Sequence, residues 1–155
     1  MPTRIYSGIL MAALGLAIAA QAAQQGARAE YVGGTRPDIP NNANGSLQAI
    51  DDQYLVFYAK KTSLRIAYEK INLIEYGQKV NRRVAMAVLI SPVLALSKTR
   101  QHFLTVGYTD ENGREQALIF KVEKSDIRAM LASLEARTGR KVEFQDEEAR
   151  KAGRG

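Results

Sequence analysis

The feature that most constrains the fold of this chain is residues 101–123, where apolar and polar side chains alternate on both sides of a short polar turn. Alternation with a period of two places successive side chains on opposite faces of a β-strand. The turn reads Asp110-Glu111-Asn112-Gly113, and Asn-Gly adopts the positive φ values that a tight hairpin turn requires. The segment therefore predicts two antiparallel strands joined by a hairpin.

Further strand patterns precede this hairpin. Residues 53–60 carry aromatic and β-branched side chains on both faces, which predicts a strand buried on both sides. After a turn at residues 60–63, residues 64–69 alternate between apolar and polar. Residues 71–76 form an apolar-rich segment that ends at Gly77. These patterns indicate that most of the chain is β-structure.

A single amphipathic helix is expected after the hairpin. Its apolar stripe has the spacing i, i+3, i+4 and i+7 and consists of Ile127, Met130, Leu131 and Leu134. Ser125 or Asp126 can cap its first turn, and Gly139 can end it in a left-handed conformation. Residues 140–144 predict a short extended piece. The charged tail at 145–155 is expected to fray or to add a weakly held helical turn.

The expected fold class is therefore α+β and mostly β, with about six or seven strands and one C-terminal helix. A lone helix with one apolar stripe covers the open end of such a sheet. The arrangement resembles the pleckstrin-homology-like antiparallel β-sandwich or partial barrel. We place this single β-rich domain at residues 46–144.

The N-terminus reads as a secretory signal peptide, residues 1–29. Arg4 precedes an apolar run at residues 5–20, and small residues then offer cleavage after Ala22 or after Ala29. The alternative is an uncleaved membrane anchor, but the run is shorter than the ~20 apolar residues that span a bilayer. Residues 30–45, rich in Gly, Pro and Asn, predict a flexible lead-in. We expect an exported protein, periplasmic or secreted.

Composition narrows the class of partner. The chain has a net charge of +6, which suits nucleic acid, an anionic membrane surface or simple solubility. Export makes nucleic acid an improbable partner, and the chain has no tryptophan to stack on single strands. It also has no cysteine, so neither a lipid anchor at the cleavage point nor a disulfide is available.

The candidate contact surface is the apolar segment at residues 84–96 with the cations on either side of it. These cations are Lys79, Arg82, Arg83, Lys98 and Arg100. An apolar segment with flanking cations suits shallow contact with an anionic bilayer or with an envelope protein. The alternative is two core strands that meet at Ser91-Pro92, or a helix broken at Pro92, with solvated charges at the ends.

No residue cluster predicts catalysis. The one histidine, His102, lacks the further ligands that a metal site needs. Residues 110–113 resemble the start of a calcium loop, but Arg114 and a strand pattern follow where further oxygen ligands are required. The acidic pairs at 51–52 and 147–148 lie in a turn and a tail. We therefore expect no metal, no cofactor and no enzymatic activity.

Three functions remain as hypotheses. The first is an exported, non-enzymatic binding or interaction module, associated with the envelope through the basic-flanked apolar segment. The second is a structural protein–protein component that uses an exposed strand edge. The third is a hydrolase with an unfamiliar site, which needs a polar pocket where a carboxylate lies within hydrogen-bond reach of His102.

Three stretches carry a narrower resemblance: IAYEKINLIEYGQK at 66–79, KTRQHFLTVGYTD at 98–110 and LEARTGRK at 134–141. With them the chain resembles a family of small exported proteins of uncharacterised function from acidobacteria-type bacteria, over roughly residues 31–153. The resemblance implies an exported single domain. The phrase at 68–74 is also similar to short bacterial pleckstrin-homology-like domains. No catalytic or binding residue follows from either likeness.

Overall fold

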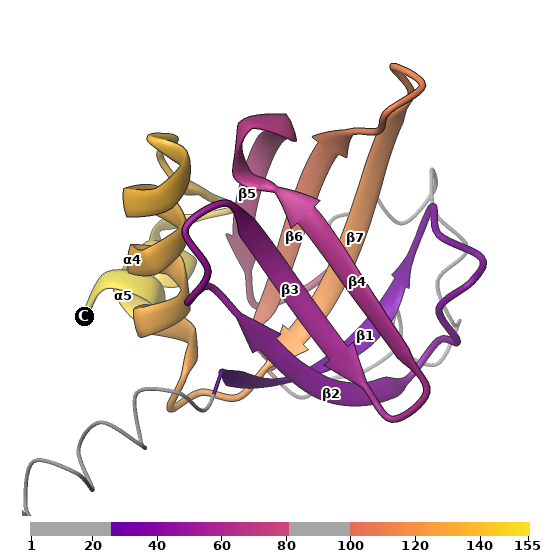
Figure 1. Cartoon of the computed structure of the whole chain (residues 1–155). Coiled ribbons are helices and arrows are strands. Elements are labelled where there is room, and N and C mark those ends of the chain that lie inside the picture. The colour runs from indigo at the N-terminus through magenta and orange to yellow at the C-terminus, as the bar shows by residue number, and fades with distance from the viewer. Residues whose placement is uncertain (1–25, 81–99) are drawn as a thin grey trace, which may run out of the picture.

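The fold is mostly β, with one curved sheet followed by C-terminal helices (Figure 1). The computed structural model describes residues 26–80 and 100–155, and the statements below concern those residues. The strands are β1 (Ala27–Gly34), β2 (Ala43–Gln48), β3 (Tyr54–Ala59), β4 (Thr62–Ala67), β5 (Ile71–Gly77), β6 (Phe103–Thr109), β7 (Glu115–Val122) and β8 (Glu143–Phe144). The helices are the 3-10 turn η1 (Tyr68–Lys70), α4 (Ile127–Thr138) and α5 (Glu147–Arg154).

The described part of the sheet has eight strands in the order β4-β3-β2-β1-β7-β6-β5-β8. All neighbours are antiparallel except β5 and β8, which pair in parallel through Tyr76↔Phe144 and the residues before them. Figure 1 shows that the sheet curves until β3 and β4 lie in front of β6 and β7, while both helices cover one side. The sheet stays open, because β4 and β8 are its two edges.

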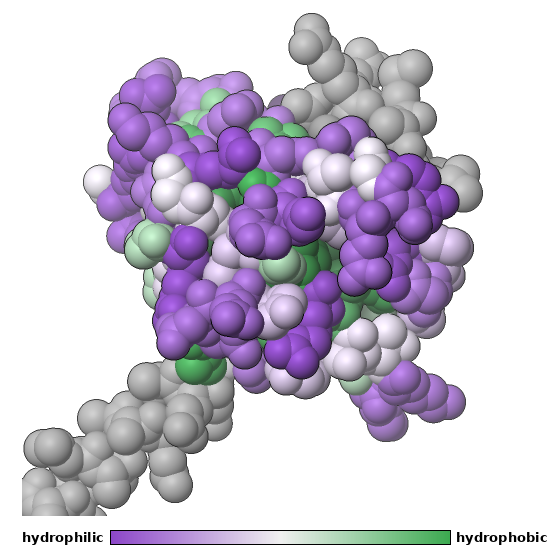
Figure 2. Space-filling model, turned by 45° about the horizontal axis from the view of Figure 1, so that its top comes forward, coloured by the Kyte–Doolittle hydropathy of each residue, from purple (hydrophilic) through white to green (hydrophobic). Residues whose placement is uncertain are grey.

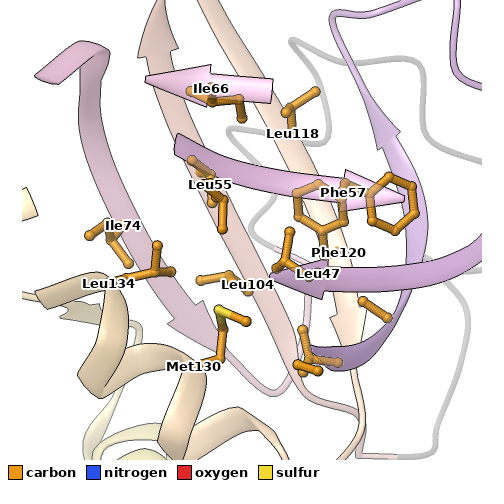
Figure 3. Packing of buried hydrophobic residues seen from close by; sticks show 14 of the residues in the cluster. Leu47, Leu55, Phe57, Ile66, Ile74, Leu104, Leu118, Phe120, Met130 and Leu134 are labelled. Atoms are coloured by element: carbon orange, nitrogen blue, oxygen red, sulfur yellow. The ribbon is translucent and has the colours of Figure 1, made fainter. Parts of the chain in front are cut away.

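The core fills the space that this curvature encloses (Figure 3). Its labelled members come from both halves of the sheet and from α4: Leu47, Leu55, Phe57, Ile66, Ile74, Leu104, Leu118, Phe120, Met130 and Leu134. Phe120 is central, with its ring centroid 5.1 Å from that of Phe57 and 5.9 Å from that of Tyr31. Burial of this apolar surface is the main stabilising term in a chain without cysteine.

The structure confirms the hairpin but corrects its turn. β6 and β7 pair from Phe103↔Lys121 to Thr109↔Glu115, as the alternation predicts. Of the Asn-Gly pair only Gly113 adopts a positive φ, 75°, and its N–H donates to the carbonyl oxygen of Asp110 at 3.0 Å. The Asp110 carboxylate also accepts hydrogen bonds from the backbone N–H groups of Asn112 and Arg114. The turn is therefore a longer Asx-stabilised loop, which a side-chain acceptor at Asp110 makes favourable.

The helix is also confirmed, but the side chain at its N-cap has a different role. The predicted stripe is buried, and Gly139 ends α4 with φ 69°. Asp126 is the N-cap residue, but its side chain makes no cap hydrogen bond. Its carboxylate instead accepts from the backbone N–H of Arg28 at 3.0 Å and from the hydroxyl of Ser125 at 2.7 Å. Asp126 thus ties the start of α4 to β1.

The expected flexible lead-in at residues 30–45 is wrong, because it contains most of β1 and the start of β2. β1 lies in the middle of the sheet, between β2 and β7. It ends in a glycine because the backbones approach closely there: a Cβ on Gly34 would lie 2.5 Å from the carbonyl oxygen of Ala117. A glycine that permits close packing resembles a loop residue in the sequence.

Smaller differences follow from local geometry. η1 interrupts the strand expected to run to residue 69, and Tyr58 in β3 is exposed on the face expected to be buried. The tail, expected to fray or to add a weakly held helical turn, forms the 8-residue helix α5, because Asp146 accepts a hydrogen bond from the Ala149 N–H at 2.7 Å and caps it. Ala149 and Gly153 are buried against the rest of the domain.

Two sequence predictions lie outside the described residues. They are the signal peptide up to residue 25 and the apolar segment at residues 84–96, together with Arg82, Arg83 and Lys98. Within the described ranges, no helix has both the length and the apolar character required to span a membrane.

Candidate functional site

Four cations surround a groove beside α4 and α5, which we call the basic groove. Its cations are Arg100, Lys124, Arg128 and Lys151, and its other lining residues are Gln78, His102, Ser125, Glu148 and Ala152. The groove has a volume of about 990 Å³. It holds four formal positive charges against one carboxylate, which distinguishes it from the mixed surface around it.

Local structure places these cations together. Lys124 lies in the short link between β7 and α4, and Arg128 lies one turn further along, in the first turn of α4. The turn between them brings both side chains to the lining of the groove. Lys151 reaches the groove from α5, and α5 docks closely because Gly153 leaves room for the rings of Phe144 and Tyr76. The groove therefore depends on the docking of α5.

Two of the four cations have no acidic partner among the described residues, namely Lys124 and Lys151. The other two, Arg100 and Arg128, each contact one neighbouring group. Arg100 lies 3.3 Å from the Glu148 carboxylate in an exposed ion pair, and Arg128 Nε donates to the Ala152 carbonyl oxygen at 3.1 Å. An exposed ion pair contributes little to stability, so an incoming anion can compete with Glu148.

His102 links the groove to the core. Its Nδ1 lies 2.5 Å from the hydroxyl oxygen of Tyr76, and the two rings stack with centroids 6.0 Å apart. Burial and the nearby charge of Lys124 lower the pKa of His102 below its ordinary value of 6.5, and burial raises the pKa of Tyr76. With His102 neutral, we infer that the phenol donates to Nδ1, which places the proton of His102 on Nε2 as a further donor.

The chemistry around His102 differs from that of a general base. A catalytic histidine is usually oriented by a carboxylate, and within the described chain its hydrogen-bond partner is the Tyr76 hydroxyl instead. The same part of the chain also contains no group of three or more His, Asp or Glu side chains placed to hold a metal ion. What the groove supplies is positive charge and N–H donors, the chemistry that binds an anion.

The predicted contact residues are only partly brought together. Arg100 lines the basic groove, whereas Lys79 is exposed and lies outside its lining. Arg82, Arg83 and Lys98 lie outside the described residues.

Sequence reasoning missed Lys124, Arg128 and Lys151. The available signal was that Lys124 and Arg128 lie on either side of the predicted start of the helix, close together along the chain. Lys151 lies in the tail that was expected to fray.

Comparison with known proteins gives no further guide. The chain matches no protein family, and a comparison with curated proteins finds no relative. The geometry of the groove is therefore the basis for a functional conclusion.

Proposed function

We propose that this protein is an exported, non-enzymatic binding module that docks an anionic lipid headgroup in the basic groove. The observation that carries the proposal is a pair of ammonium groups, Lys124 and Lys151, which have no acidic partner among the described residues and lie in a concave site with two arginines. A cation near an anionic surface contributes ~1 kcal/mol to attraction, so four of them are sufficient for reversible docking.

The described surface favours electrostatic contact over insertion. Figure 2 shows a face covered mostly by polar side chains, with hydrophobic ones visible in the gaps between them. Among the described residues, only Ile50 and Tyr58 are large hydrophobic side chains that are exposed. The envelope contact through residues 84–96 remains a separate hypothesis, because that segment lies outside the described residues.

The topology supports a pleckstrin-homology-like fold as part of this proposal. Two antiparallel meanders, β1 to β4 and β5 to β7, join through β1 and β7, and a helix follows β7. From this strand order we infer a partial barrel covered by one helix. β8 and α5 are additions to that pattern, and α5 supplies one wall of the basic groove.

The test is flotation with vesicles of phosphatidylglycerol and phosphatidylcholine, compared with vesicles of phosphatidylcholine alone. The wild-type protein is expected to float only with the anionic vesicles, and less as salt rises, because salt screens exposed charges. Replacing Lys124→Gln together with Lys151→Gln is expected to weaken binding about tenfold or more. Lys60→Gln with Lys61→Gln, in the β3–β4 turn, is the matched control.

Three outcomes would contradict the proposal. The first is that the Lys124→Gln, Lys151→Gln variant floats as well as the wild-type protein. The second is that the control variant loses binding to the same extent, which indicates a general charge effect. In the third, soluble glycerol phosphate binds the groove but does not compete with binding of the protein to vesicles. The ligand is then a free phosphate and not a lipid headgroup.

A further inference from the structure

His102 is the residue of the basic groove whose charge can change near neutral pH. Besides this histidine the lining contains lysine, arginine, glutamate and uncharged side chains. Lysine and arginine lose their proton only above about pH 10, and a glutamate is ionised above about pH 4. Imidazole has an ordinary pKa of 6.5, so protonation of His102 would change the groove from four cations to five.

Titratable and charged groups face His102 from the surrounding elements. Burial and the charge of Lys124 lower the pKa of His102, whereas the charge of Glu123 raises it. Without a bound anion, the buried and positive surroundings therefore favour the neutral ring. The groups concerned are Tyr76 from β5, Arg100 before β6, Glu123 and Lys124 after β7, Arg128 from α4, and Glu148 and Lys151 from α5.

The contact with Tyr76 favours the neutral ring as well. A neutral His102 accepts the phenol proton at Nδ1, across the 2.5 Å contact described above. In the imidazolium both ring nitrogens carry a proton, so Nδ1 donates and the Tyr76 oxygen has to accept. The phenol proton must then turn away from the ring, in a residue that is fully buried.

A bound anion changes this balance. An anion among Arg100, Lys124, Arg128 and Lys151 offsets the positive charge that opposes protonation, and it attracts the imidazolium directly. His102 lines the same groove, so it lies beside any anion that fills it. Coupling between two bound species is reciprocal: if the anion favours the proton on His102, the proton favours the anion by the same factor.

We propose that protonation of His102 strengthens anion binding in the basic groove, so that mildly acidic solution tightens the docking of the protein. The inference rests on the proposed function in one respect, because it takes the basic groove as the anion site. It adds a regulating signal to that site, namely the proton.

The test uses sulfate as the probe, because sulfate keeps two negative charges from pH 5 to pH 8. NMR follows the titration of His102, the one histidine of the chain, with and without sulfate. Calorimetry measures the affinity for sulfate at pH 5 and at pH 7.5. Sulfate is expected to raise the pKa of His102, and binding is expected to be about tenfold tighter at pH 5.

Variants separate His102 from the other titrating groups. His102→Gln keeps a side-chain donor but cannot titrate in this range, so the affinity ratio between the two pH values should fall close to one. Tyr76→Phe removes the phenol that favours the neutral ring, so the rise in affinity should occur at a higher pH. Lys60→Gln with Lys61→Gln should keep the wild-type ratio.

The proposal is overturned if sulfate leaves the titration of His102 unmoved, or if His102→Gln keeps the full pH dependence. Flotation with the anionic vesicles at both pH values separates this inference from the proposed function. Equal flotation at pH 5 and pH 7.5 overturns the coupling and leaves lipid docking in place. Coupling to sulfate without flotation at either pH supports the inference and contradicts lipid docking.

Discussion

The Tyr76 hydroxyl oxygen lies 2.5 Å from Nδ1 of His102, and this contact connects the hydrophobic core to the basic groove. Tyr76 is fully buried in β5, whereas His102 precedes β6 and lines the groove. The phenol accordingly fixes both the orientation and the tautomer of the imidazole. The neutral ring adds a donor to the groove without adding a fifth charge next to Lys124.

Removing this hydroxyl group should raise the pKa of His102. In the Tyr76→Phe variant the neutral imidazole loses the donor that stabilises it, so its pKa moves up toward the ordinary 6.5. Because His102 is the only histidine of the chain, an NMR titration follows it without ambiguity. Tyr58→Phe is the control and should leave that pKa unchanged. A pKa that falls in Tyr76→Phe would contradict the proposed direction of the hydrogen bond.

The lowered pKa of His102 also predicts how stability depends on pH. Between its folded pKa and the unfolded value of 6.5, the unfolded state binds more protons. The contribution of neutral His102 to the free energy of unfolding is therefore complete above pH 6.5. It is lost as the pH falls through the pKa of His102 in the folded state. Urea unfolding between pH 7 and pH 5 should show this decrease, and His102→Gln should flatten it. The lowered pKa values of Asp51, Asp110 and Asp126 act below this range, since their ordinary value is 3.8.

The core prediction concerns Phe120, which contacts the rings of both Tyr31 and Phe57. Phe120→Ala leaves a cavity where three strands meet, and the free energy of unfolding should fall by about 3–5 kcal/mol. Ile50→Ala, at a side chain that is 44% exposed, should change it by no more than about 0.5 kcal/mol. Chemical denaturation measures both. Equal effects would mean that the described core is not the core in solution.

Sequence patterns predicted the parts of the fold in which side-chain periodicity and backbone structure agree. Residues 103–122 were predicted as two strands from a period of two in their side chains, although both faces of β6 are buried. The stripe from Ile127 to Leu134 repeats because one side of α4 is buried. β1 was missed for another reason. Its buried Ala27, Ala29 and Tyr31 do alternate with Arg28 and Glu30, but the small residues at 27–29 also read as the end of a signal peptide, and Gly33-Gly34 reads as a loop.

The basic groove was largely hidden from the sequence for a different reason. It combines Arg100, the link before α4, and α5, which are separated along the chain and meet only after docking. A local sequence pattern describes one element at a time, whereas the excess of positive charge in the groove arises from three separate parts of the chain. The position of β4 at an edge of the described sheet was hidden likewise, since it follows from topology.

Docking of α5 can be tested at Gly153. A Cβ there would lie 2.7 Å from Phe144 Cε1 and 3.2 Å from both Leu131 and Tyr76 side-chain atoms. Gly153→Ala should therefore cost about 1–3 kcal/mol through overpacking. It should also speed amide exchange across residues 147–154 and weaken vesicle flotation, because Lys151 leaves the groove. Gly113→Ala, where the added Cβ meets open space, should destabilise the hairpin turn alone.

The last prediction concerns where the proposed signal peptide is removed. Processing after Ala29 would delete the first residues of β1, which pair with both β2 and β7. Arg28 makes two main-chain contacts there: its N–H donates to the Asp126 carboxylate, and its carbonyl oxygen accepts from Glu123, both at 3.0 Å. Processing after Ala22 preserves all of these contacts.

We therefore expect mass spectrometry of the exported protein to give a chain that begins at Ala23. Because the Arg28 contacts join β1 to the start of α4, a chain that begins at Glu30 should lose about 2 kcal/mol or more, at ~1 kcal/mol for each hydrogen bond removed. A chain that begins at Ala23 should unfold at the same urea concentration as the exported protein. An exported chain that begins at Glu30 and is equally stable would contradict the assignment of residues 27–29 to the sheet, because a strand that contributes those contacts cannot be removed without cost.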